Sequence, residues 1–92
     1  MWFYKGIVLT HLKKYSSAIQ SFQKSLLIDP TNADCWYNIG CAQSLNKNVN
    51  DSLKSLKIAI TLDKGFKKDL KTDKDLKNVR KSKMINELLL ID

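Results

Sequence analysis

The apolar side chains of this chain recur at intervals of three to four residues, the spacing of one face of a helix. Trp36, Ile39 and Gly40 follow this spacing, and a second run follows it over residues 53–60. Between the two runs, residues 45–50 are rich in Asn and lack apolar periodicity, which predicts a turn. The pattern therefore predicts two helices joined as a hairpin.

The same pattern occurs twice, because the chain aligns with itself without a gap when Trp2 is placed on Trp36. In this alignment Gly6 falls on Gly40. The other matched pairs combine residues of similar size: Ala18 with Ser52, Ile19 with Leu53, Phe22 with Leu56, Ser25 with Ala59, Leu26 with Ile60, Ile28 with Leu62, and Asp29 with Asp63. A period of about 34 residues is a signature of stacked helical hairpins.

The expected helix boundaries carry turn and capping residues. Pro30 cannot continue the helix before it, and Thr31 or Asn32 can cap the helix that follows. Asn48 or Asn50 can cap the helix after the turn of the second hairpin. We therefore predict an all-α fold in which antiparallel hairpins stack as a short α-solenoid. The predicted units are two helical hairpins, at residues 1–30 and 31–63, and a segment of basic capping helices at residues 64–92.

Small residues recur where the two helices of each hairpin should meet. Gly6 and Gly40 are expected to let the partner helix approach closely, and Ala18 and Ser52 to do the same from the other side. Together with the large residues, they resemble the tetratricopeptide repeat family over residues 1–63. The first unit matches the family pattern at Trp2, Gly6, Leu9, Ala18, Phe22, Ser25 and Pro30, and the second at Trp36, Ile39, Gly40, Ser52, Leu56 and Ala59. The departures are Lys5 where the family has Leu, Gln43 where it has Tyr, and Lys64 where it has Pro.

The resemblance implies a scaffold for protein–protein interaction, in which the first helix of each hairpin lines a concave groove that takes a peptide or a partner helix. The groove positions that it implies are Phe3, Ile7, Thr10 and His11 in the first unit, and Asp34, Tyr37, Asn38, Cys41, Ser44 and Leu45 in the second. Asn38 lies where related domains hold a peptide backbone or carboxylate. The variant of the family that clamps a C-terminal carboxylate needs Lys and Asn where this chain has Phe3 and Ile7, so we do not expect that variant.

Charge is concentrated in the last third of the chain. The net charge is +7, and residues 64–83 contain nine basic and three acidic side chains. The basic residues are Lys64, Lys67, Lys68, Lys71, Lys74, Lys77, Arg80, Lys81 and Lys83. They are expected to keep the outer face of a terminal cap in water, as a solenoid requires. The alternative is an adaptor for nucleic acid or another polyanion. The intervening acidic residues disfavour that alternative, and residues 73–76 resemble the Asp-x-Asp-Leu that closes many arrays of the family.

The sequence carries little material for catalysis or for a metal site. It has no nucleophile motif and no glycine-rich phosphate loop, so we expect no enzyme activity, no catalytic residue and no cofactor. Cys35 and Cys41 are six residues apart and about 240° apart on a helix, so they cannot share a metal or a disulfide. We interpret both as reduced packing residues in a reducing compartment. No signal peptide and no run long enough to cross a bilayer is evident, which favours a cytoplasmic protein without a membrane partner.

The first helix is crowded with apolar side chains. Trp2, Phe3, Tyr4, Ile7 and Val8 would cover nearly every face of it. A helix of this kind leaves some apolar surface exposed, which marks an interaction face. The sequence therefore also suggests a homodimer formed through the N-terminal hairpin.

Overall fold

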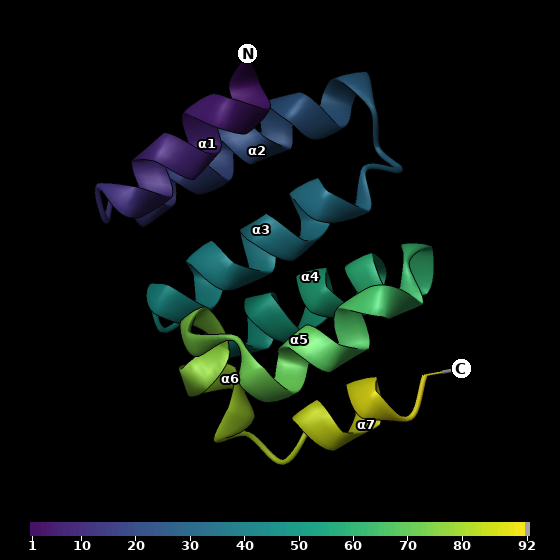
Figure 1. Cartoon of the computed structure of the whole chain (residues 1–92). Coiled ribbons are helices and arrows are strands. Elements are labelled where there is room, and N and C mark those ends of the chain that lie inside the picture. The colour runs from purple at the N-terminus through teal and green to yellow at the C-terminus, as the bar shows by residue number, and fades with distance from the viewer. Residues whose placement is uncertain (92) are drawn as a thin grey trace.

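Figure 1 shows a computed structural model of the chain, which describes residues 1–91. Within those residues every regular element is a helix, as the all-α prediction requires. The four long helices are α1 (Trp2–His11), α2 (Tyr15–Ile28), α3 (Ala33–Leu45) and α4 (Val49–Leu62). Short helices follow: η1 (Lys64–Phe66), α5 (Lys67–Thr72), η2 (Lys74–Leu76), α6 (Lys77–Arg80) and α7 (Ile85–Leu89). Helix α1 packs on α2 and α3 packs on α4, and the two hairpins stack through α2 and α3.

The turns inside the two hairpins repeat in conformation as well as in position. Lys13 and Lys47, which occupy equivalent positions in the two repeats, both have a left-handed backbone, with φ of 62° and 64°. The helix after the first hairpin is capped by Asn32, whose side-chain oxygen accepts a hydrogen bond from the Cys35 N–H at 3.1 Å. Asn48 occupies the N-cap position of α4, but its side chain makes no capping hydrogen bond.

Gly6 and Gly40 both lie where the two helices of a hairpin are in direct contact. A Cβ atom on Gly6 would lie 2.6 Å from a ring carbon of Phe22, and a Cβ atom on Gly40 would lie 2.7 Å from Leu56 Cδ2. Atoms that close overlap, so each hairpin needs a glycine at this position. Phe22 and Leu56 are equivalent in the repeat, and both are essentially fully buried. The predicted reason for the two glycines is therefore confirmed.

Two hydrophobic clusters form the core. The first joins the first hairpin to α3 through Phe22, Leu26, Cys35 and Ile39, among others. The second joins α3 and α4 to the C-terminal segment, and Leu56, Ile60, Leu70, Leu76, Val79, Ile85 and Leu88 belong to it. Trp36 packs against both clusters. Cys35 and Cys41 are buried free thiols, as predicted.

The C-terminal segment is fastened to the second hairpin by polar contacts as well as by its apolar side chains. Asp73 interrupts the helical path between α5 and η2, and its side chain accepts a hydrogen bond from the Asp75 N–H at 2.9 Å. Arg80 donates to the carbonyls of Leu70 and Asp73, and Asn78 donates to the carbonyl of Ser44. None of the described helices combines the length and the apolar character needed to span a membrane.

Candidate peptide-binding groove

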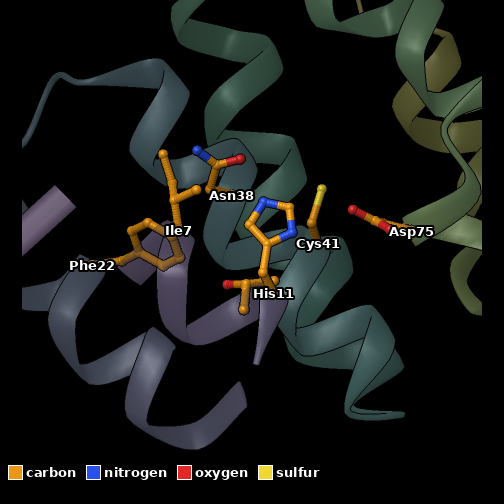
Figure 2. Close-up of a pocket in the computed structure, with 7 residues that line it drawn as sticks. Ile7, His11, Phe22, Asn38, Cys41 and Asp75 are labelled. Atoms are coloured by element: carbon orange, nitrogen blue, oxygen red, sulfur yellow. The ribbon is translucent and has the colours of Figure 1, made fainter. Parts of the chain in front are cut away.

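A small pocket opens where α1, α3 and η2 meet (Figure 2). Its volume is about 90 Å³. Seven residues line it: Ile7, Thr10 and His11 from α1, Phe22 from α2, Asn38 and Cys41 from α3, and Asp75 from η2. The pocket therefore combines apolar and polar side chains, and its lining comes from four helices.

Half of the sequence-predicted groove residues line this pocket. Ile7, Thr10, His11, Asn38 and Cys41 are brought together there, because residues of α1 and α3 that are about one repeat apart in the sequence lie side by side in stacked hairpins. The other five predicted residues lie elsewhere: Phe3, Asp34, Tyr37, Ser44 and Leu45.

These five residues differ in their surroundings. Phe3 packs against the first core cluster, with its ring centroid 5.9 Å from that of Phe22. Asp34 is exposed in the first turn of α3, and Leu45 is half-buried at the opposite end of that helix. Ser44 is completely buried, and its hydroxyl has no hydrogen-bond partner among the described residues.

Tyr37 faces the C-terminal segment. Its hydroxyl donates a hydrogen bond of 2.5 Å to Asp73 Oδ2, and its ring stacks on Phe66 with a centroid distance of 4.6 Å. Burial, followed by the hydrogen bond to Asp73, raises the pKa of Tyr37 far above its usual value. The phenol is therefore a protonated donor that holds the segment in place, and little of it is free for a ligand.

The two aspartates of η2 and its N-cap have different roles. Both oxygens of Asp73 accept hydrogen bonds, one from the Tyr37 hydroxyl and one from the Asp75 N–H. The carboxylate of Asp75, by contrast, accepts none from the described residues, and it lines the pocket. Asp75 is not among the groove positions that the sequence predicts, although it belongs to the Asp-Lys-Asp-Leu stretch that resembles a closing motif of the family.

A mixed donor set lies beside the pocket. The ligand atoms of Cys41, Asp73 and Asp75 all lie within 4.8 Å of one another, and such sulfur and oxygen donors are of the kind that bind Zn²⁺. However, burial raises the pKa of the Cys41 thiol well above its usual value, and the nearby aspartates raise it further. The thiol is thus neutral, and both oxygens of the Asp73 carboxylate already accept hydrogen bonds from the protein.

Asp75 is in an unfavourable electrostatic environment. Burial raises the pKa of its carboxyl, the negative charge of Asp73 raises it further, and Lys74 and His11 oppose the effect. Each of the first two causes disfavours the charged form. Asp75 is therefore a half-buried carboxylate that the fold itself compensates poorly.

Asp75→Asn is expected to stabilise the protein at neutral pH. A carboxyl whose pKa is higher in the folded state than in the unfolded state stabilises the fold below the unfolded pKa of about 3.9, and this contribution is lost as the pH rises through the folded pKa. Because the group is only partly buried, the expected gain in Tm at pH 7 is small, about 1–3 °C. Thermal unfolding of variant and wild type at pH 4 and pH 7 measures it. A Tm difference that is no larger at pH 7 than at pH 4 would contradict this account.

The sequence-predicted basic residues divide into two groups. Two of them are half-buried and bind backbone carbonyls: Lys67 donates to Ile91, and Arg80 to Leu70 and Asp73. The other seven are exposed: Lys64, Lys68, Lys71, Lys74, Lys77, Lys81 and Lys83. The basic segment thus combines contacts that hold the fold with an exposed positive surface.

Comparison with known families agrees with the repeat seen in the structure. Tetratricopeptide repeat profiles match residues 1–32 and residues 21–54. Comparisons with curated proteins and with solved structures gave no match. The two family matches together cover more than half of the chain, and they span α1, α2, α3 and the first part of α4. The chain belongs to the tetratricopeptide repeat family.

Proposed function

We propose that this protein is a non-catalytic interaction module that binds a peptide or a partner helix along the groove between α1 and α3. Tetratricopeptide repeats are protein-interaction modules, and this supports the general role. The observation that carries the finer proposal is the pocket, in which five of the predicted groove residues meet. The apolar side chain of Ile7 beside polar Asn38 and Thr10 suits a ligand with both an apolar surface and hydrogen-bonding groups.

Asn38 provides the sharpest test of this groove. Its side chain is half-buried at the pocket, and neither its donors nor its acceptor are used by the hydrogen bonds of the described residues. Asn38→Ala removes those groups from the wall and leaves the core contacts of α3 in place. A random twelve-residue peptide library displayed on phage and selected on the full chain supplies the probes.

We expect Asn38→Ala to reduce the affinity for the selected peptides about fivefold to twentyfold, because a hydrogen bond is lost in a site from which the peptide has displaced water. Binding is measured by fluorescence anisotropy with labelled peptides. Asn86→Ala is the matched control, because Asn86 is exposed on α7. Selected peptides that bind Asn38→Ala and wild type equally well, or a library that yields no peptide, would contradict binding in the groove.

A second candidate is a polyanion adaptor, supported by the seven exposed lysines of the C-terminal segment. Lys67, Lys68 and Lys71, with Leu89, line a cavity of about 350 Å³ in the same segment. Salt separates the two candidates. A nucleic acid held by several lysines should lose affinity by orders of magnitude between about 50 and 200 mM salt, whereas a groove peptide should lose much less. Replacing Lys68, Lys71 and Lys77 with Gln should abolish the first kind of binding and spare the second.

We also propose that the first hairpin supports self-association. Tyr4 is 67% exposed and Val8 is 56% exposed on α1, and Trp2 is partly exposed with the Lys24 ammonium 4.1 Å from its ring centroid. Burying such side chains against a second copy offsets the cost of association only when a broad face is covered. Light scattering over a dilution series should show a mass near two chains that falls on dilution, and less dimer for Val8→Ser. A constant monomer mass at high concentration would contradict self-association.

A further inference from the structure

We infer that the pocket between α1, α3 and η2 is a subsite for a positively charged side chain of the bound peptide, either a lysine ammonium or an arginine guanidinium. This inference rests on the proposed function, because it assigns a ligand chemistry to the same groove. The residues that carry it are the polar Asp75, Asn38 and Thr10 and the apolar Ile7, which line the pocket together.

The first step is the free carboxylate. Asp75 accepts no hydrogen bond from residues 1–91, although its backbone N–H is used by Asp73. Its side chain is half-buried and lies on the pocket wall, and Figure 2 shows the carboxylate pointing toward Cys41 at the edge of the hollow. Withdrawing a carboxylate from water without a partner is unfavourable. A ligand that supplies a cation would pair with this carboxylate and offset the electrostatic cost of its partial burial.

The second step concerns the other charged groups around the pocket. No lysine or arginine is among the residues that line it, and Cys41 is a buried thiol whose raised pKa keeps it neutral. His11 and Lys74 act on Asp75, but Asp73 lies on the same side and adds a second negative charge. A ligand carboxylate would lie against Asp75, with the charge of Asp73 within 4.8 Å of that carboxylate, so the local field selects a cation and rejects an anion.

For the bound peptide, the negative charge at the pocket matters more than the positive net charge of the whole chain. The net charge of +7 would repel a basic peptide at long range. At physiological ionic strength, however, exposed charges are screened over about 8 Å, whereas a half-buried carboxylate in contact with its ligand is screened far less. The lysines of the C-terminal segment therefore lower the rate of encounter more than they weaken the bound state.

The shape and lining of the pocket fit the end of one long basic side chain. A volume of about 90 Å³ takes the end of a side chain but no folded segment of peptide. The half-buried Ile7 offers apolar surface to the methylene stem, as Lys and Arg stems require. Asn38 and Thr10 offer oxygen acceptors, since the Thr10 hydroxyl donates its proton to the Gly6 carbonyl and keeps its lone pairs for a ligand.

The experiment uses peptides selected from the random library on the full chain, restricted to those that Asn38→Ala weakens. In each peptide every Lys and Arg is replaced in turn by norleucine, which keeps the apolar stem and removes the charge. We expect one basic position to dominate, with a loss of about tenfold or more, as for a charge-assisted hydrogen bond. Asp75→Asn should cause a similar loss with the parent peptide, and almost no further loss with the norleucine peptide.

Asp51→Asn is the control, because Asp51 is an exposed carboxylate on α4, away from the groove. It should bind the parent peptide as wild type does. Groove-dependent peptides that contain no basic residue, or that bind Asp75→Asn as tightly as wild type, would overturn the inference and leave the proposed function standing. A library that yields no groove-dependent peptide would overturn both. The norleucine peptides test the charge without any change to the protein, so a folding defect of the variant cannot imitate the result.

Discussion

Leu56→Ala is expected to lower the free energy of unfolding by about 2–5 kcal/mol. Leu56 is fully buried, lies against Gly40 within its own hairpin, and belongs to the cluster that contains Leu70 and Leu76. Removing it would leave a cavity where the second hairpin meets the C-terminal segment. Since domains of this size have a total stability of about 5–15 kcal/mol, the loss is a large fraction of the whole. Urea unfolding followed by circular dichroism measures it.

Leu62→Ala is the matched control, because Leu62 lies on the same helix and is 43% exposed, whereas Leu56 is fully buried. It should change the free energy of unfolding by about 0.5 kcal/mol or less. Equal losses for Leu56→Ala and Leu62→Ala would show that the side of α4 assigned to the core is wrong.

Gly40→Ala extends this prediction, because its sign should depend on Leu56. With Leu56 present, the added Cβ would lie 2.7 Å from Leu56 Cδ2, so the variant is expected to lose about 1–3 kcal/mol. In the Leu56→Ala background the obstacle is gone. The same change should then gain up to about 1 kcal/mol from the better helix propensity of Ala. Additive effects of the two substitutions would contradict the close contact between α3 and α4.

The features that sequence could predict are those that repeat. The alignment of the chain with itself pairs Gly6 with Gly40 and Phe22 with Leu56, and each pair of equivalents performs the same packing task in the structure. Periodic apolar positions and small residues are local signals, so they predicted the hairpins. The family resemblance built on them predicted five of the seven residues that line the pocket. The left-handed Lys13 was beyond such reasoning, because residues other than glycine rarely adopt a positive φ.

The features that sequence could not predict lie in contacts between a repeat and the non-repeating segment. Tyr37 and Asp73 are 36 residues apart, and the chain near Asp73 no longer follows the repeat, so no periodicity connects them. The same holds for Asp75, which completes the pocket from η2. A short polar motif predicts that a capping segment follows. Which side chains this segment contacts depends on how it packs across α3.

Tyr37→Phe is expected to lower the free energy of unfolding by about 1.5–3 kcal/mol, the range for a hydrogen bond to a charged group. The change removes the donor to Asp73 Oδ2, whereas the ring can keep its stacking on Phe66. Tyr4→Phe is the control, since Tyr4 is 67% exposed on α1. Urea unfolding of the two variants makes the comparison, and equal stability of both would contradict a structural role for the Tyr37 hydroxyl.

Hydrogen exchange can show which part of the chain loses stability in Tyr37→Phe. Because the Tyr37 hydroxyl joins α3 to the residue that caps η2, protection in Tyr37→Phe should fall more at residues 67–80 than in α1 and α2. A uniform fall along the chain would instead indicate that the cap and the hairpins unfold only as one unit. The expected loosening also moves Asp75, since its N–H is bound to Asp73. Tyr37→Phe should therefore lower the affinity for a groove peptide although Tyr37 does not contact that peptide. For this reason Asn38, rather than Tyr37, is the residue to replace when the groove itself is tested.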